Sequence, residues 1–523
     1  MNNGKMIFLY GPPLSGKSTI GEMFARRVDL PFYDLDKLIE SRTVMTIPEI
    51  FSTKGEDYFR DLECSVLEEI CNEDIGIVAL GGGALIRSKA RKLVEDRGEV
   101  ILLQASSQVL ISRMKGDQNK RPLLGASTEK EIIDLLNKRE EHYNSFPAQI
   151  QTDQDTVDDI LFELEALLGV FLVSGMGTSY QVQFSSGIVN DLGKKLRLLK
   201  RGGPITVVSD QNVADLYAGS VLASLDEAGY QSSLIVFPPG ENSKTMDTVQ
   251  NIWDGFLKAN VDRGSTVIAL GGGVVGDLTG FAAATFHRGV DWVNIPTSLL
   301  AMVDAGIGGK TGVDLPQGKN LVGAFHPPRQ VWIDPGFLQS LPEIELQNGM
   351  AEVIKHGVIS DPDLFALALE GRSPFDLNRS EILRRAVAVK VAIIQKDPYD
   401  QNLRQVLNFG HTLGHAVELA SDFKLSHGES IAIGMVAETR TAEIMGLTAP
   451  GLLEKIISIL NEWDLPVDLP SFLSLERIWE SVRRDKKKSA GRLQFALPLN
   501  IGQVKAKIEV DEKTWKSVLR IRK

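Results

Sequence analysis

A glycine-rich loop between a short apolar run and a helical segment constrains the fold of this 523-residue chain more than any other feature. Gly11–Ser18 satisfies the pattern G-x-x-x-x-G-K-[ST], after apolar Met6–Tyr10 and before helical Thr19–Arg27. Glycines let backbone N–H groups curl around phosphate oxygens at a helix N-terminus, where Lys17 would reach the β- and γ-phosphates and Ser18 would hold Mg²⁺. The loop therefore predicts an ATP-dependent kinase on a parallel α/β sheet.

Three further features concern the phosphate acceptor. Asp34 and Asp36 follow a short apolar run and would leave a strand end on the same side, one serving Mg²⁺ through water and the other accepting a hydroxyl proton. A solvated turn explains such a pair equally well. The bare backbone of Gly81–Gly83 would let a small ring substrate lie close, and R-P-L-L from Arg121 resembles a mobile lid carrying an arginine.

Together these features resemble shikimate kinase over nearly all of residues 1–165. The matching patterns are the phosphate loop, D-x-D, the arginine after G-E-x-x-F, G-G-G, R-P-L-L and R-x-x-x-Y. The resemblance implies Mg²⁺ at Ser18 and Asp34, with Lys17 and Arg121 acting on the phosphates and Asp36 on the 3-hydroxyl of shikimate. It implies ATP contacts at Gly11, Ser15, Gly16, Lys17, Ser18, Thr19 and Arg121, and shikimate contacts at Asp36, Arg60, Gly81, Gly82, Gly83 and Arg139.

One residue departs from that family's pattern. Leu14 stands in the phosphate loop where the family often has glycine. We expect the change to be tolerated if this residue needs no positive φ.

Patterning divides the chain into three predicted domains, 1–168, 169–338 and 339–523. The α/β rhythm of the first resumes in the second, with strand candidates such as Ser233–Phe237 and Thr266–Leu270. In the third, glycines thin out and stretches such as Gln401–Ala420 carry helical periodicity. The predicted class is α/β: a P-loop NTPase-type parallel-sheet domain, a Rossmann-like α/β domain and a mostly helical metal-binding domain.

Glycines and carboxylates at strand ends predict a dinucleotide site in the second domain. Gly271–Asp277 reads G-G-G-V-V-G-D after a strand candidate, and such turns bring backbone close to a pyrophosphate. Asp210 and Asn212 end one earlier strand, and P-G-E-x-x-K, containing Glu241 and Lys244, follows another. Carboxylates at these positions suit ribose hydroxyls.

Histidines concentrated in the third domain predict a metal site. The chain has seven histidines, and four of them lie in A-E-x-I-K-H-G, N-F-G-H-T-x-G-H-A and S-H-G-E. Glu352, His411 and His427 form a reasonable catalytic Zn²⁺ set with an open position. Scattered helix-surface histidines are the alternative. Cations and amides interleaved with these ligands suggest a substrate bearing phosphate and carboxylate.

From about Asp210 to Lys487 the motifs resemble 3-dehydroquinate synthase, including P-T-S-L-L-A-x-V-D, G-G-K-T-G-V and K-N-x-x-G-A-F. The resemblance implies Zn²⁺ or Co²⁺ at Glu352, His411 and His427. It implies NAD⁺ contacts at Asp210, Asn212, Glu241, Lys244, Gly272, Gly273, Asp277, Thr297 and Lys319. It implies substrate contacts at Arg288, Asp304, Lys310, Asn320, Lys355, Lys390, Arg404, Asn408 and His415.

The implied substrate is 3-deoxy-D-arabino-heptulosonate 7-phosphate. Transient oxidation at C5 acidifies the C6 proton, phosphate leaves, the ketone is reduced again and the ring closes, so NAD⁺ is regenerated. In that family the residue matching Arg288 comes from a neighbouring subunit, which implies a homodimer. One departure is Asp400, where the family often has glutamate, so its contact would be shorter or water-mediated.

Composition excludes other classes and leaves two alternatives open. A net charge of -11 argues against nucleic acid or an anionic membrane as the main partner. Two cysteines, and no apolar stretch near the ~20 residues that a membrane span needs, predict a cytoplasmic enzyme. The second half could instead be a metal-dependent polyol dehydrogenase that releases NADH. The first could be a nucleotide-sensing regulator without activity, against which the intact Lys17, Asp34, Asp36 and Arg60 argue.

Overall fold

The computed structural model describes residues 6–73, 75–116, 129–153, 156–488 and 493–519. The chain forms two compact units, Met1–Leu172 and Val173–Lys523. Among the described residues, no helix of membrane-spanning length is apolar enough to cross a bilayer.

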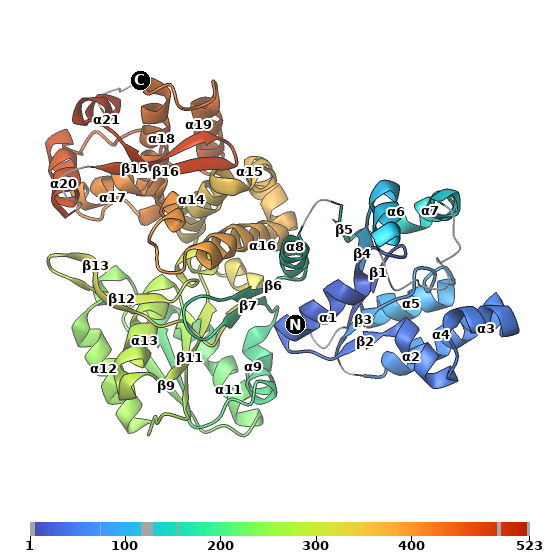
Figure 1. Cartoon of the computed structure of the whole chain (residues 1–523). Helices are drawn as coiled ribbons and strands as arrows, with labels where there is room; N and C mark the ends of the chain where they lie inside the picture. Colours follow the sequence, from blue (N-terminus) through green and yellow to red (C-terminus); the bar gives the residue numbers. More distant parts are fainter. Residues whose placement is uncertain (1–5, 74, 117–128, 154–155, 489–492, 520–523) are drawn as a thin grey trace. The chain divides into compact units, whose positions relative to one another are not determined.

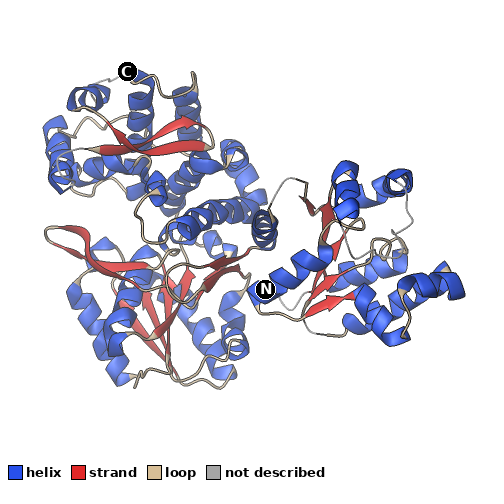
Figure 2. Ribbon diagram, viewed as in Figure 1, coloured by secondary structure: helices blue, strands red, loops and turns tan. Residues whose placement is uncertain are grey.

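The first unit is built on a five-stranded parallel sheet in the order β2-β3-β1-β4-β5, with helices on both faces (Figures 1 and 2). Side chains of the central strand alternate between two cores, because Phe8 and Tyr10 pack on one face and Ile7 and Leu9 on the other. The strands are β1 (Met6–Tyr10), β2 (Phe32–Asp34), β3 (Ile77–Ala79), β4 (Gly98–Gln104) and β5 (Gln149–Gln151). The helices are α1 (Lys17–Val28), α2 (Leu35–Thr43), α3 (Ile47–Lys54), α4 (Glu56–Ile70), α5 (Ser88–Arg97), α6 (Ser107–Gly116), α7 (Glu129–Asn144) and α8 (Val157–Leu168).

The second unit contains most of a seven-stranded sheet in the order β6-β7-β14-β11-β10-β8-β9, whose edge strand β6 spans the boundary between the units. The pairs from β7 to β9 are parallel. A separate antiparallel hairpin joins β12 (Lys310–Leu315) to β13 (Gly318–Phe325). The sheet strands are β6 (Val170–Val173), β7 (Tyr180–Phe184), β8 (Ile205–Asp210), β9 (Ser232–Phe237), β10 (Thr266–Gly271), β11 (Asp291–Pro296) and β14 (Gln330–Ile333). The helical segments are α9 (Ile188–Leu198), α10 (Gln211–Val213), η2 (Ala214–Ala218), α11 (Gly219–Glu227), η3 (Glu241–Ser243), α12 (Met246–Lys258), α13 (Gly273–Thr285), η4 (Phe286–Arg288), η5 (Ala301–Ala305) and η6 (Pro335–Gln339).

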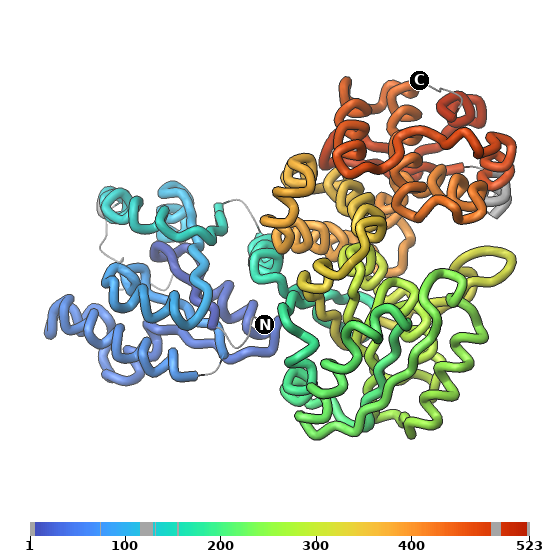
Figure 3. Tube along the Cα trace, turned by 180° about the vertical axis from the view of Figure 1, so that it is seen from behind, coloured from blue at the N-terminus to red at the C-terminus, as the bar shows by residue number. Residues whose placement is uncertain are grey.

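The rest of the second unit is mostly helical and lies beside the α/β part, as the orange-to-red tube in Figure 3 shows. Its strands, β15 (Gln494–Asn500) and β16 (Gln503–Glu509), form an antiparallel hairpin. Its helical segments are α14 (Glu343–Ser360), α15 (Pro362–Leu369), α16 (Arg372–Lys396), η7 (Leu403–Asn408), α17 (His411–Ala420), α18 (His427–Ile444), α19 (Leu452–Glu462), α20 (Leu475–Lys488) and α21 (Glu512–Val518). The predicted fold class is therefore confirmed.

One predicted helical stretch is wrong in detail. Gln401–Ala420 is not a continuous helix, because the 3₁₀ segment η7 ends at Asn408 and α17 begins at His411. Between them Gly410 adopts φ +80°, a left-handed conformation that interrupts helical hydrogen bonding. The break starts a new helix at the first histidine of the motif.

Candidate active sites

The phosphate loop joins β1 to α1, as predicted. Gly11 has no room for a side chain, because a Cβ there would lie 2.1 Å from the Leu103 carbonyl oxygen. The buried Lys17 ammonium donates to the carbonyl oxygens of Gly11, at 2.9 Å, and Pro12, at 2.7 Å. Ser18 and Thr19 follow Lys17 in the first turn of α1, whose glycine N-cap supplies no capping side chain. That helix end therefore leaves backbone N–H groups available to an anion.

Leu14 adopts a positive φ, so the condition under which this substitution was expected to be tolerated is not met. Its φ is +67°, a conformation that costs a leucine roughly 1–2 kcal/mol relative to the right-handed region. The Arg113 guanidinium donates to the Leu14 carbonyl oxygen at 3.1 Å and to Thr152 Oγ1 at 3.1 Å. These bonds hold the strained loop against the residue that follows β5.

The three glycines after β3 are packed against side chains of the predicted shikimate set. A Cβ on Gly81 would lie 2.9 Å from Asp36 Oδ1, and one on Gly83 would lie 2.5 Å from the Arg60 guanidinium. A Cβ on Gly82 would lie 3.3 Å from the Gly11 carbonyl oxygen. The absence of side chains thus lets the two binding loops and the two charged residues approach one another.

The Gly82 carbonyl oxygen also gathers donors from two other elements. Arg139 donates to it at 2.8 Å and the Tyr143 hydroxyl at 2.7 Å, both from α7. The Tyr10 hydroxyl, at the end of β1, lies 3.3 Å away. The structure therefore brings Arg139 to the glycine loop, whereas Arg121 lies outside the described residues.

The expected geometry of Asp34 and Asp36 is wrong. Asp34 ends β2 and caps α2 by accepting the Lys37 N–H at 3.2 Å, while Asp36 lies in the first turn of that helix. Strand alternation therefore does not apply to the pair. Helical geometry instead directs Asp36 toward Gly81.

Glu63 belongs to this cluster and was missed in the sequence. It ion-pairs with Arg60 one turn earlier on α4, and a Cβ on Gly81 would lie 2.8 Å from its Oε1. Burial raises the pKa of Glu63 to about 7, against the opposing effect of Arg60. The i,i+3 spacing after Arg60 was the available signal.

The raised pKa predicts a pH-dependent stability of the first unit. Folding raises the pKa of Glu63 from 4.5 to about 7, so the protonated carboxyl group stabilises the folded state. This stabilisation is fully present below pH 4.5 and is lost as the pH rises through about 7. We expect unfolding free energy to fall between about pH 5 and about pH 8 by roughly 1–3 kcal/mol more in the wild type than in Glu63→Gln. Proteolysis in urea, followed through peptides from residues 6–104, measures this difference. Equal pH slopes in the two proteins would contradict the assignment.

The predicted NAD⁺ residues follow the ends of four neighbouring parallel strands of the second unit. Asp210 ends β8 and caps α10, and Glu241 and Lys244 follow β9. The glycine loop after β10 leads into α13, and Thr297 follows β11, its N–H donating to the Gly271 carbonyl oxygen at 2.9 Å. Parallel strands end at one edge of a sheet, where open α/β sheets bind their ligands. Glycine-started α13 leaves its first N–H groups free of side-chain caps, as a pyrophosphate site requires.

Ion pairs connect this edge to the β12–β13 hairpin. Lys244 Nζ lies 2.6 Å from both Asp277 Oδ2 and Asn320 Oδ1. Burial raises the pKa of Asp277 to about 6, although Lys244 opposes the change. Lys319 Nζ lies 3.4 Å from Glu241 Oε1, so the hairpin carries side chains to the predicted NAD⁺ residues.

Glu352, His411 and His427 converge, although they come from α14, α17 and α18. Glu352 Oε1 lies 3.3 Å from His427 Nε2 and 3.5 Å from His411 Nε2, and the three ligand atoms lie within 4.8 Å of one another. His411 Nδ1 is 3.2 Å from the Phe409 carbonyl oxygen, which can only accept, so Nδ1 carries the proton. The Nε2 lone pair then faces a carboxylate, an arrangement that a metal ion would stabilise.

Electrostatics agree with two of the three donors. Burial, together with the Lys355 charge, holds the pKa of His411 well below its usual value, so the ring is neutral. Burial raises the pKa of Glu352, but Lys355, His411 and His427 together outweigh it, so the pKa of Glu352 is lowered and its carboxylate is ionised. A neutral imidazole and an ionised carboxylate are the forms that bind Zn²⁺. For the third donor, burial lowers the pKa of His427, but Glu352 and Glu418 outweigh burial and raise it to about 9, so a metal ion would have to displace a proton from that ring.

Cations predicted to bind substrate surround the ligands, each already paired with a group of the chain. Lys390 Nζ lies 2.6 Å from Asp304 Oδ1, and burial lowers its pKa to about 8 despite that partner. Lys310 Nζ lies 2.6 Å from Asp400 Oδ2. Lys355 pairs with Glu352, and Arg404 donates to the Pro398 carbonyl oxygen at 2.7 Å. Two uncharged residues of the predicted substrate set belong to neighbouring segments: Asn408 ends η7, and the centre of the His415 ring lies 5.0 Å from that of the His411 ring.

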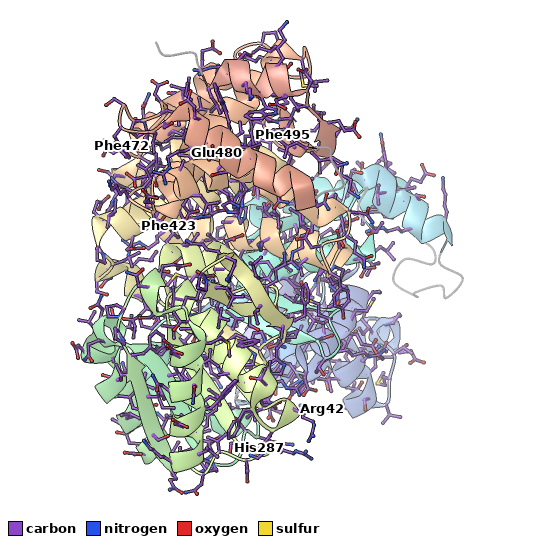
Figure 4. All side chains as sticks on the ribbon, turned by 90° about the vertical axis from the view of Figure 1, so that its left-hand side faces the viewer. Arg42, His287, Phe423, Phe472, Glu480 and Phe495 are labelled. Carbon is purple, nitrogen blue, oxygen red and sulfur yellow. The ribbon has the colours of Figure 1, made fainter. Side chains whose placement is uncertain are left out.

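Arg288 is not brought to this cluster. It lies at the end of η4, exposed, with φ +65°. Figure 4 shows its neighbour His287 at the outer edge of the α/β part, far from Phe423, which precedes the His427 helix. Within one chain, Arg288 and the metal ligands are therefore separate.

Comparison with known proteins finds family matches in both units. Residues 234–348 match the model of the 3-dehydroquinate synthase N-terminal domain, and residues 349–488 match that of the C-terminal domain. A 3-dehydroquinate synthase from Synechocystis sp. is 43% identical over 347 residues, covering 65% of this chain and 96% of that protein. The chain belongs to the 3-dehydroquinate synthase family. Residues 13–167 match the shikimate kinase family, so the predicted fusion of two shikimate-pathway enzymes is confirmed.

Two solved structures are similar to the synthase unit. A 2-epi-5-epi-valiolone synthase from Streptomyces hygroscopicus subsp. jinggangensis, with NAD⁺ and Zn²⁺ bound, is 30% identical with a TM-score of 0.60, and the match covers 67% of this chain and 98% of that one. A 2-deoxy-scyllo-inosose synthase complexed with carbaglucose-6-phosphate, NAD⁺ and Co²⁺ is 25% identical with a TM-score of 0.62, covering 67% and 99%.

Proposed function

We propose that the two residue clusters described above carry the two activities of this fusion. The first would transfer the γ-phosphoryl group of ATP to the 3-hydroxyl of shikimate. The second would convert 3-deoxy-D-arabino-heptulosonate 7-phosphate to 3-dehydroquinate and phosphate. The observation that carries the proposal is the convergence of Glu352, His411 and His427 beside buried, paired cations. We also propose domain bounds at 1–168, 169–338 and 339–523.

In the kinase site, each residue has a distinct task. Lys17 and the N-terminus of α1 would bind the phosphates of ATP, and Ser18 with Asp34 would hold Mg²⁺. Arg60 and Arg139 would bind the shikimate carboxylate beside the bare backbone of Gly81–Gly83. Asp36 would orient the 3-hydroxyl and accept its proton. The role is supported by the position of its carboxylate beside Gly81, in the loop against which shikimate would bind.

In the synthase site, NAD⁺ would supply a reversible hydride acceptor for C5, and Zn²⁺ or Co²⁺ on Glu352, His411 and His427 would polarise the C5 oxygen. Lys310, Lys355, Lys390 and Arg404 would bind the substrate's phosphate and carboxylate. Each would exchange its present partner for a substrate oxygen, so the site keeps its charges compensated before substrate arrives. Asp304, Asn320, Asn408 and His415 would orient hydroxyls.

Arg288 would complete the synthase site of a second copy of the chain. Its exposure, its positive φ and its distance from the ligands of its own chain support this role. The proposal includes a homodimer formed through the synthase unit.

A mass-spectrometric assay of the purified chain tests both reactions. With the heptulosonate phosphate, substoichiometric NAD⁺ and Zn²⁺, we expect phosphate and dehydroquinate to form without NADH accumulating. With shikimate, ATP and Mg²⁺, we expect ADP and a phosphorylated shikimate. NADH in proportion to turnover would favour a polyol dehydrogenase instead, and ATP binding without phosphoryl transfer would favour a regulatory first unit.

A further inference from the structure

A second carboxylate faces the proposed metal ligand His427. Glu418 lies on α17, three residues after His415, with its side chain 7% exposed. Its Oε2 is 3.6 Å from His427 Nδ1, whereas His427 Nε2 lies 3.3 Å from Glu352 Oε1. The two ring nitrogens of His427 therefore point to different carboxylates. If Nε2 offers its lone pair to a metal, Nδ1 must carry the proton. The Glu418 carboxylate then faces this N–H group as its hydrogen-bond acceptor.

Lys319 fixes the orientation of the Glu418 carboxylate. Its ammonium, from β13, lies 2.9 Å from Glu418 Oε1, which leaves Oε2 for His427. The same ammonium lies 4.5 Å from the centre of the Phe423 ring. Figure 4 labels Phe423, which stands in the short link between α17 and α18.

The link itself is strained, which indicates that the two helices are held in a required position. Asp422 and Phe423 adopt φ +54° and +58°, two successive non-glycine residues in the left-handed region. Such a conformation persists only where surrounding contacts impose it. Here Arg477 pairs with Asp422 through two hydrogen bonds, and the Lys319 ammonium lies over the Phe423 ring.

We infer that Glu418 is a positioning residue of the metal site. By accepting a hydrogen bond from the protonated Nδ1 of His427, Glu418 turns Nε2 toward Glu352 and His411 and makes that nitrogen a stronger ligand. The inference rests on the metal site of the proposed function. It assigns Glu418 no contact with the metal ion or the substrate.

The same residues offer a competing arrangement that chemistry disfavours. His415, Glu418 and His427 have ligand atoms within 4.8 Å of one another and could hold an ion of their own. That ion would have to take Nδ1 of His427, which the first site requires in its protonated form. It would also place its positive charge beside the Lys319 ammonium, which lies 2.9 Å from Glu418 Oε1.

Cobalt binding to the full chain tests the inference. We expect Glu418→Gln to weaken Co²⁺ affinity, measured by chelator competition, roughly 10- to 100-fold, and to shift the ligand-field absorption of the bound ion. Glu443→Gln, the same substitution on α18, should leave both unchanged. Glu418→Asp keeps the charge and should retain part of the affinity, so the test survives if the amide variant fails to fold.

The outcomes separate this inference from the proposed function. Unchanged affinity and spectrum in folded Glu418→Gln would overturn the positioning role, as would an equal loss in Glu443→Gln. Two tightly bound Co²⁺ ions per wild-type chain would overturn it in favour of the competing site. A wild-type chain that binds no Co²⁺, or His411→Ala binding as tightly as wild type, would instead reject the metal site of the proposed function.

Discussion

Replacing His411 with alanine is expected to abolish tight metal binding and to lower phosphate release from the heptulosonate phosphate by at least roughly 10³-fold. The three donors lie within 4.8 Å of one another, and removing one leaves a carboxylate and a single imidazole. Two ligands neither hold Zn²⁺ tightly nor fix its open position toward substrate. Metal content by mass spectrometry and phosphate release should therefore fall together.

Two comparisons make this result specific to the metal site. The shikimate-dependent reaction of the same variant should be unchanged, since His411 lies in the other compact unit. His326→Ala removes an imidazole of the synthase unit that contacts the Val290 carbonyl oxygen, and it should retain metal and activity. An active, metal-free His411→Ala variant would remove His411 from the ligand set.

The parallel-sheet parts of the fold were predictable because their signals are local. β1 is a five-residue apolar run buried on both faces, followed at once by the glycine loop that starts α1. The dinucleotide motifs follow strands that pair in parallel, so one sheet edge collects them. The metal ligands could be grouped for a different reason: few residue types bind Zn²⁺, and the histidines of the third domain are concentrated in short motifs.

Features that depend on tertiary contacts could not be read from the sequence. Leu14 takes a left-handed conformation that its side chain disfavours, and Asp36 lies in a helix rather than along a strand. Glu63 and Glu418 are three residues beyond predicted site residues, a spacing that marks a shared helix face. That spacing cannot reveal that Gly81, in the loop after β3, lies beside Glu63, or that Lys319 of β13 pairs with Glu418.

Asp36→Asn is expected to reduce shikimate-dependent ADP release by roughly 10²- to 10⁴-fold while the chain stays folded. The substitution keeps the shape of the side chain beside Gly81 but removes the charge that would accept the hydroxyl proton. ATP affinity, measured by calorimetry, should be unchanged, because the phosphate loop is a separate segment.

Asp29→Asn is the matched control for this prediction. Asp29 is exposed at the end of α1, and its φ of +55° is a conformation that asparagine also adopts readily. It should retain full turnover, which separates the loss of proton transfer from a general effect of charge. Undiminished turnover in Asp36→Asn would remove Asp36 from the mechanism. Glu63, the other carboxylate beside Gly81, would then be the remaining candidate base, because burial raises its pKa to about 7 and so makes it a stronger proton acceptor.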